Sequence, residues 1–162
     1  MGEVLLRCFG ALLLLAAAAG WGFYEIRDGR RRILELEAVL DLIRALREGI
    51  DRLSAPLSEI YAAYENPVLR ENGFLTLLRA KGMAEAVDGT DWRLSTEELA
   101  VLRDLASRLG RGFREEQTAL CRYAGDRLED ALEKRRTDED GRARLWRTIP
   151  LLAALSLILL LL

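Results

Sequence analysis

The two ends of the chain carry almost no charge, and this feature constrains the fold more than any other. Residues 4–23 contain a single charged residue, Arg7, near their beginning, and residues 148–162 contain none. A helix of about twenty residues spans roughly 30 Å, the thickness of the apolar core of a bilayer. We therefore expect residues 1–24 to form an N-terminal transmembrane helix and residues 148–162 a somewhat short C-terminal one.

The first apolar segment has a second interpretation as a cleaved signal peptide, because the small residues before Trp21 would suit a signal peptidase. Cleaved leaders usually begin with a basic stretch, but here Glu3 offsets Arg7. The basic cluster instead follows the segment, where it would stop transfer across a membrane, so we favour an uncleaved anchor.

For the last apolar segment, residues 148–162, the alternative is a buried helix of a soluble protein. A terminal run of leucines without a polar face favours the membrane.

Clusters of arginine border both apolar ends on the side of the central region. Cytoplasmic flanks of membrane helices are enriched in Lys and Arg. We therefore expect the central domain, residues 25–147, in the cytoplasm and both chain ends outside. Membrane lipids are expected partners, because basic residues near a bilayer attract anionic headgroups. The residues expected to set this topology are Arg30, Arg31, Arg32, Arg142, Arg144 and Arg147.

Between these ends, apolar residues recur every three or four positions, as they do on one face of a helix. Pro56 suits the first turn of a helix, and the residue before Pro67 avoids helical angles. Residues 82–91 are rich in turn formers and predict a surface loop. The pattern as a whole predicts helices over residues 26–53, 57–65 and 68–81, the last with a break near Asn72-Gly73.

A capping box predicts where the next helix begins. The Ser95 hydroxyl can accept a hydrogen bond from the Glu98 amide while the Glu98 carboxylate accepts from the Ser95 amide. The leucine stripe that follows ends at Gly110 and Gly112. A long final helix is expected from about Phe113, with an interruption over residues 137–141. Its expected core residues are Phe113, Gln117, Leu120, Ala124, Leu128, Ala131 and Leu132.

The central domain contains no segment in which apolar and polar residues alternate with the period of a strand. β-Branched residues are also scarce. We therefore expect an all-α fold, an antiparallel helical bundle of about five or six helices, flanked by an N-terminal and a C-terminal transmembrane helix. The central domain is long enough to bury a core of its own.

The residue inventory argues against catalysis. Histidine is absent, which removes the commonest general base and the commonest metal ligand. No phosphate-binding loop, dinucleotide motif, zinc motif or serine-hydrolase motif occurs. The net charge of −2 gives no electrostatic case for nucleic acid. We expect no enzyme activity, no cofactor, no metal, no nucleic acid and no small-molecule substrate, and reduced thiols at Cys8 and Cys121.

Several motifs follow one another in a fixed order between the two apolar ends of the chain. They are Trp21-Gly22-Phe23, a basic stretch and leucine-rich helix over residues 30–50, Pro56-Leu57-Ser58-Glu59, the leucine series Leu99, Leu102, Leu105 and Leu109-Gly110, and Trp146 before the last span. In these motifs, in their order and in its double-anchor layout, the chain resembles the stage III sporulation protein AB family of endospore-forming bacteria. One departure is Pro150, which stands where that family usually has a small residue.

The resemblance implies a membrane-anchored component of the channel between mother cell and forespore. The central domain would be similar to the domains of type II secretion and type IV pilus platform proteins. It would act as a platform or docking protein for a secretion-type ATPase and for other channel components. The protein would lie in the mother-cell membrane facing the forespore, as a multi-pass protein.

Within this resemblance, Pro56, Leu57, Ser58 and Glu59 are the candidate partner-docking residues, and Glu59 would meet basic residues of the ATPase. The same four residues also suit an ordinary helix N-terminus. Two further hypotheses stay open at this point. One is a generic hairpin-anchored membrane scaffold or regulator with no secretion role, and the other is a secreted helical domain whose leader is removed.

Overall fold

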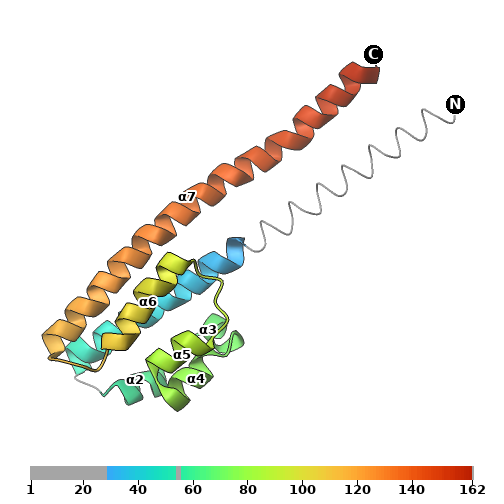
Figure 1. Ribbon diagram of the computed structural model, residues 1–162. Coiled ribbons are helices and arrows are strands. Elements are labelled where there is room, and N and C mark those ends of the chain that lie inside the picture. The colour runs from blue at the N-terminus through green and yellow to red at the C-terminus, as the bar shows by residue number, and fades with distance from the viewer. Residues whose placement is uncertain (1–28, 54–55, 162) are drawn as a thin grey trace. The chain divides into compact units, whose positions relative to one another are not determined.

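The computed structural model describes residues 29–53 and 56–161, and these residues form helices and connecting turns without any strand (Figure 1). The all-α prediction is therefore confirmed for this part of the chain. The contacts divide the chain into two compact units, one of residues 31–135 and the other of the residues before and after them. The bundle described below is the unit of residues 31–135.

The structure describes the two expected membrane spans to different extents. The N-terminal one, residues 1–24, lies outside the described residues, as does Cys8. The C-terminal one, residues 148–162, has a helical backbone up to Leu161, where the last helix ends. Among the described residues, no helix combines the length and the apolar character that crossing a membrane requires.

The first helix of the bundle covers residues 29–48 and continues as a π-helical turn, η1 (Gly49–Leu53). Figure 1 shows it from blue to teal. Its apolar residues recur three or four positions apart and face the core, as an amphipathic helix requires. The prediction of a continuous helix up to residue 53 is therefore confirmed. Its most buried side chains are Leu36, Val39, Leu40, Leu42, Ile43 and Leu46.

Three short helices follow, and asparagine, proline and glycine set their boundaries. The Asn66 side chain caps the second of them, because it accepts hydrogen bonds from the amides of Val68 at 3.0 Å and Leu69 at 3.3 Å. Gly73 has a φ of 82°, which favours glycine and breaks the helix at the predicted position. The helices are α2 (Leu57–Ala63), α3 (Pro67–Glu71) and α4 (Phe74–Lys81).

Residues 82–91 are not the surface loop that their composition predicts, because most of them form α5 (Met83–Gly89). Three apolar residues in this segment recur at helical spacing, so the segment can bury one face against the core. The turn formers near its end only terminate the helix, where the Thr90 hydroxyl donates to the Ala86 carbonyl at 2.7 Å. The buried residues are Met83, Ala86 and Val87.

The next helix, α6 (Thr96–Arg108), begins at the predicted capping box. The Glu98 amide donates to the Ser95 hydroxyl at 3.3 Å, and the Ser95 amide donates to the Glu98 carboxylate at 2.7 Å. The helix ends before Gly110 and Gly112, whose φ values of 82° and 98° are ones that side-chain-bearing residues rarely adopt. Both boundaries predicted for this helix are confirmed.

The last helix, α7 (Arg114–Leu161), corrects two expectations. It runs through residues 137–141 without the expected interruption, because a lone Gly141 is tolerated within a helix at a cost of about 1 kcal/mol. Phe113 is not a core residue, since 79% of it is exposed. Leu120, Ala124, Leu128 and Leu132 are buried as expected, whereas Gln117 and Ala131 are half-buried.

The helix over residues 29–48 and α7 pack against each other in opposite directions within the bundle. Arg44 forms an ion pair with Glu129 at 2.5 Å, and a Cβ on Gly125 would lie 3.8 Å from Ile43. Farther along the first helix, Arg47 is close enough to Cys121 to influence its titration. The antiparallel bundle predicted from periodicity is thus present, although it contains more and shorter helices than expected.

Candidate partner-docking surface

The Pro56–Glu59 segment lies at the beginning of α2, where it is mostly open to solvent. Pro56 occupies the N-cap position with an extended backbone, and its carbonyl accepts hydrogen bonds from the amides of Glu59 at 3.0 Å and Ile60 at 3.3 Å. Pro56, Ser58 and Glu59 are exposed, and Leu57 is half-buried. The predicted docking residues are therefore presented together on one ordered helical turn.

The inner side of α2 is fixed to the bundle by Tyr64, the residue that follows the helix. Its hydroxyl donates to the Asp41 carboxylate at 2.9 Å and approaches the Ala38 carbonyl at 3.3 Å. Burial first, and then Asp41, raises the pKa of Tyr64, so this hydroxyl stays a donor at neutral pH. Ile60 and Tyr61 bury the same side of the helix, so the outer side of α2 is held in a defined position.

The carboxyl end of α2 is capped by a side chain from α4. The Arg79 guanidinium donates to the carbonyls of Tyr61 at 3.3 Å and Tyr64 at 2.8 Å, which the helix itself leaves unsatisfied. It also forms an ion pair with Glu65 at 2.6 Å, and this contact lowers the pKa of the Glu65 carboxyl. Arg79, a residue of α4, therefore holds the carboxyl end of α2 in place.

A shallow groove of about 380 Å³ runs beside α2. It contains no pair of groups arranged as nucleophile and base. Its floor combines an aromatic ring, aliphatic carbons and the guanidinium just described, a mixture typical of protein contact surfaces. The lining residues are Ser58, Tyr61, Ala62, Leu78, Arg79 and Gly82.

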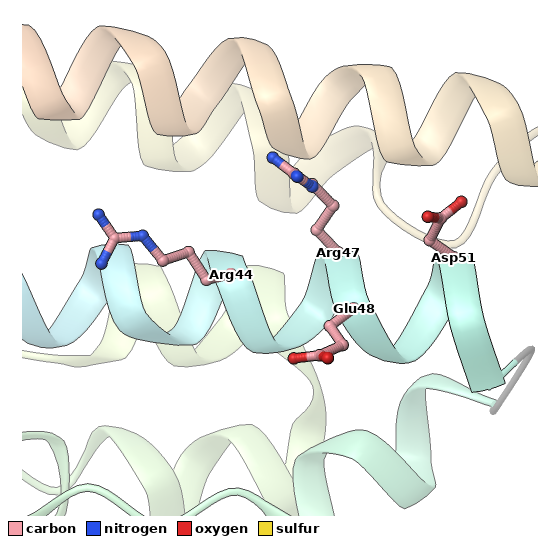
Figure 2. Close-up of a pocket in the computed structure, with 4 residues that line it drawn as sticks. All are labelled: Arg44, Arg47, Glu48 and Asp51. Carbon is pink, nitrogen blue, oxygen red and sulfur yellow. The ribbon is translucent and has the colours of Figure 1, made fainter.

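A second groove, of about 310 Å³, is lined entirely by charged side chains: Arg44, Arg47, Glu48 and Asp51 (Figure 2). No sequence motif marks this groove. Both signs of charge are present in equal number, and the Arg44 guanidinium is paired with Glu129. In the part of the chain that the structure describes, no three acidic or cysteine side chains are grouped as metal ligands. A groove lined by charges of both signs is typical of a hydrated polar surface.

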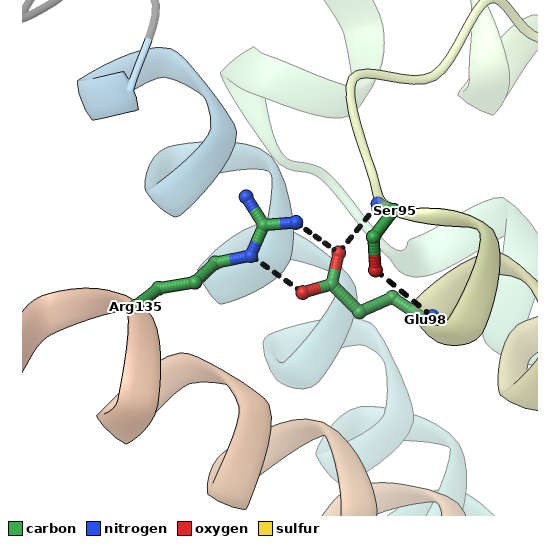
Figure 3. Close-up of polar contacts among 3 residues, drawn as sticks. All are labelled: Ser95, Glu98 and Arg135. Atoms are coloured by element: carbon green, nitrogen blue, oxygen red, sulfur yellow. Dashed lines mark hydrogen bonds and ion pairs between the residues drawn. The ribbon is translucent and has the colours of Figure 1, made fainter. Parts of the chain in front are cut away.

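One buried ion pair joins α6 to α7 (Figure 3). The Arg135 guanidinium donates to both carboxylate oxygens of Glu98, at 2.6 and 2.7 Å. The Glu98 side chain is 5% exposed and that of Arg135 23% exposed. The same carboxylate also accepts a hydrogen bond from the Ser95 amide of the capping box. The Glu98 side chain therefore connects the start of α6 to α7.

The residues expected to set topology are only partly described. Arg30, Arg31 and Arg32 are exposed near the beginning of the first helix. The side chains of Arg142, Arg144 and Arg147 lie outside those that the structure describes. Cys121 is a free, fully buried thiol.

The fold defines a small all-α protein, a bundle of short helices closed by one long helix. The family model of stage III sporulation protein AB matches residues 78–162, which is more than half of the chain. The chain belongs to the stage III sporulation protein AB family and is therefore a sporulation-related protein. No curated protein and no solved structure matches it. The Pro56–Glu59 segment precedes the matched residues.

Proposed function

We propose that the protein is a membrane-anchored platform of the channel between mother cell and forespore, and that its bundle docks a secretion-type ATPase. Family membership is the observation that carries this proposal. It favours a sporulation role over a generic hairpin-anchored scaffold or regulator. The protein itself contributes binding rather than catalysis, which agrees with a chain that contains no histidine.

The arrangement of the bundle supports a hairpin-like attachment to a membrane. Glu35, early in the first helix, accepts a hydrogen bond from the Arg93 amide at 2.9 Å, just before α6. Arg135, at the end of the same unit, contacts Glu98 at the start of α6. The chain therefore enters and leaves the bundle at one end. Two apolar anchors, residues 1–24 and 148–162, would then reach the same bilayer, with the arginine clusters facing anionic lipid.

The proposed docking surface lies at the other end of the bundle. A Cβ on Gly110, two residues after α6, would lie 3.2 Å from the Leu57 side chain. Since α6 has 13 residues, the two ends are about 20 Å apart at 1.5 Å per residue. The Pro56–Glu59 turn would thus face away from the bilayer and into the mother-cell cytoplasm, where an ATPase can approach.

Co-purification from detergent with the candidate secretion-type ATPase tests this proposal, with Glu59→Arg as the variant. Glu97→Arg is the matched control, because Glu97 is also an exposed acidic residue in the first turn of a helix, at the opposite end of the bundle. Both substitutions lose the same favourable interaction with a helix N-terminus, so they have similar effects on folding.

We expect the wild-type chain and the Glu97→Arg variant to retain the ATPase and the Glu59→Arg variant to lose most of it. Failure of the wild-type chain to retain the ATPase would contradict the platform role. Equal retention by all three chains would leave the platform role standing and remove the Pro56–Glu59 turn as its docking surface.

A further inference from the structure

Phe113 is the most exposed large apolar side chain among the described residues. It is 79% exposed, more than Tyr123 at 57% or Leu34 at 45%, the other large apolar side chains that the described residues expose. Exposing an aromatic ring of this size is unfavourable in water. Buried aromatic anchors dominate the binding energy of many protein interfaces. An isolated, exposed Phe is therefore a candidate anchor for a partner.

The turn that carries Phe113 is held in one conformation. The Phe113 amide donates to the Glu116 carboxylate at 3.3 Å, which caps the start of α7. Gln117 bridges the turn, because its side chain accepts from the Gly110 amide at 3.2 Å and donates to the Gly112 carbonyl at 3.1 Å. Because the turn is already ordered, its backbone would lose little conformational entropy when Phe113 binds a partner.

Phe113 lies at the same end of the bundle as the proposed docking turn. Gly110, three residues before it, approaches the Leu57 side chain as described above. This end is also remote from the place where the chain enters and leaves the bundle, which argues against a lipid surface as the occupant. Phe113 and the Pro56–Glu59 turn can therefore contact one partner at the same time.

The charges near Phe113 indicate what the partner must offer. Arg111 and Arg114 are exposed on either side of it along the chain, Glu115 and Glu116 are exposed in the first turn of α7, and Glu59 is exposed on the neighbouring turn. The Glu116 carboxylate is already engaged by the Phe113 amide. A partner that binds both Arg111 and Glu59 needs carboxylates beside the ring and basic residues opposite Glu59. Opposite charges on two sides of one apolar anchor would fix the orientation of the complex.

We infer that Phe113 is the aromatic anchor of the docking surface and that it inserts into an apolar pocket with an acidic rim on the ATPase. This inference rests on the proposed function and extends its surface from the Pro56–Glu59 turn to the turn over residues 110–113. Arg111 would pair with the rim of that pocket.

The test measures equilibrium binding of the full-length chain, in detergent, to the purified ATPase. The variants are Phe113→Ser and Arg111→Glu, with Tyr123→Ser as the matched control on α7, about 15 Å farther along the chain. We expect binding to weaken about 10- to 100-fold for Phe113→Ser, less for Arg111→Glu, and about twofold or less for Tyr123→Ser.

A photo-crosslinking residue placed at position 113, and separately at 123, gives a second readout that does not depend on the loss of a side chain. We expect a crosslink to the ATPase from position 113 only. If the wild-type chain does not bind, the proposed function and this inference both fail. If Glu59→Arg weakens binding but Phe113→Ser does not, only the inference fails. A crosslink from 113 to a second copy or to lipid would also overturn it.

Discussion

Cys121 is a buried thiol whose environment makes it sensitive to alkaline pH. Its side chain is fully buried, and burial raises its pKa from 9.0 to about 11. Burial likewise raises the pKa of the neighbouring Tyr61 to about 12, and the charge of a Cys121 thiolate adds to this effect. Both groups are therefore neutral in the folded chain near pH 7.

The raised pKa of Cys121 predicts a fall in stability between about pH 9 and pH 11. In that window the unfolded chain releases the thiol proton and the folded chain keeps it, so unfolding becomes more favourable as pH rises. Below pH 9 this contribution is fully present, and above pH 11 it is lost. The rise of the pKa from 9.0 to about 11 corresponds to about 3 kcal/mol in total, of which about 2 kcal/mol is lost by pH 11, where the folded thiol is half ionised.

Urea unfolding of the chain in detergent at pH 8 and pH 11 checks this prediction. The Cys121→Ala variant serves as the control, because it removes the titrating group and should lose about 2 kcal/mol less over this range. Tyrosine ionisation contributes to both chains, so the difference between them is the informative quantity. An identical pH dependence for the two chains would show that Cys121 does not titrate in this way.

Glu98 and Arg135 are expected to be strongly coupled. Replacing Glu98 with Ala leaves the half-buried Arg135 guanidinium without its partner and removes the acceptor of the Ser95 amide. Breaking a buried pair costs about 3–5 kcal/mol, and the partial exposure of Arg135 lowers our expectation to about 2–4 kcal/mol. A double-mutant cycle with Arg135→Met measures the coupling by urea unfolding. Strictly additive effects would argue against the ion pair.

At the scale of the elements, the junction between η1 and α2 depends on a glycine. A Cβ at Gly49 would lie 2.5 Å from the Ile60 Cδ1 atom and 2.8 Å from its Cγ1 atom. Helix propensity alone predicts that Gly49→Ala stabilises the helix by about 1 kcal/mol. Because Ile60 is buried and cannot easily move, we expect the substitution to destabilise the protein by about 1–2 kcal/mol instead.

The Ile60→Ala background tests whether this contact is the cause. Alanine lacks both the Cδ1 and the Cγ1 atom that approach the new Cβ, so Gly49→Ala should cost much less there than in the wild-type chain. Thermal unfolding of the four chains measures the difference. An equal cost in both backgrounds would indicate that Gly49 is needed for its backbone conformation and not for the space beside Ile60.

Helix boundaries were predictable where a local rule acts. Asn66, Gly73 and the Ser95–Glu98 capping box work through hydrogen bonds and backbone angles within a few residues. The same rules predict a loop in place of α5, and this prediction is wrong. The cluster of turn formers at the end of the segment favours a loop more strongly than the helical spacing of its apolar residues favours a helix. The short span of that spacing, barely two turns, makes such a segment ambiguous from sequence alone.

The composition of the candidate surface was only partly predictable. The sequence marks Pro56–Glu59 as a motif, but the apolar character and helical spacing of Phe113 predict a core position for it, whereas it is exposed. Its exposure follows from the geometry of the turn before α7. Likewise, the approach of Gly110 to Leu57 joins residues more than fifty positions apart. No local pattern reports such a contact.

For the whole molecule, the bundle has one end where the chain enters and leaves and another that carries Pro56–Glu59 and Phe113. This polarity is a property of the described residues and does not depend on the anchors. Together with two apolar chain ends and the family membership, it supports our proposal that the protein holds an ATPase at a membrane through the end of the bundle that carries Pro56–Glu59 and Phe113.

The decisive measurement is sedimentation of the purified ATPase with lipid vesicles that contain the full-length chain. We expect the ATPase to sediment with these vesicles, to stay in the supernatant with empty vesicles, and to be released when Glu59→Arg and Phe113→Ser are combined. An ATPase that sediments equally with empty vesicles, or that stays in solution despite vesicles carrying the wild-type chain, would contradict the proposal.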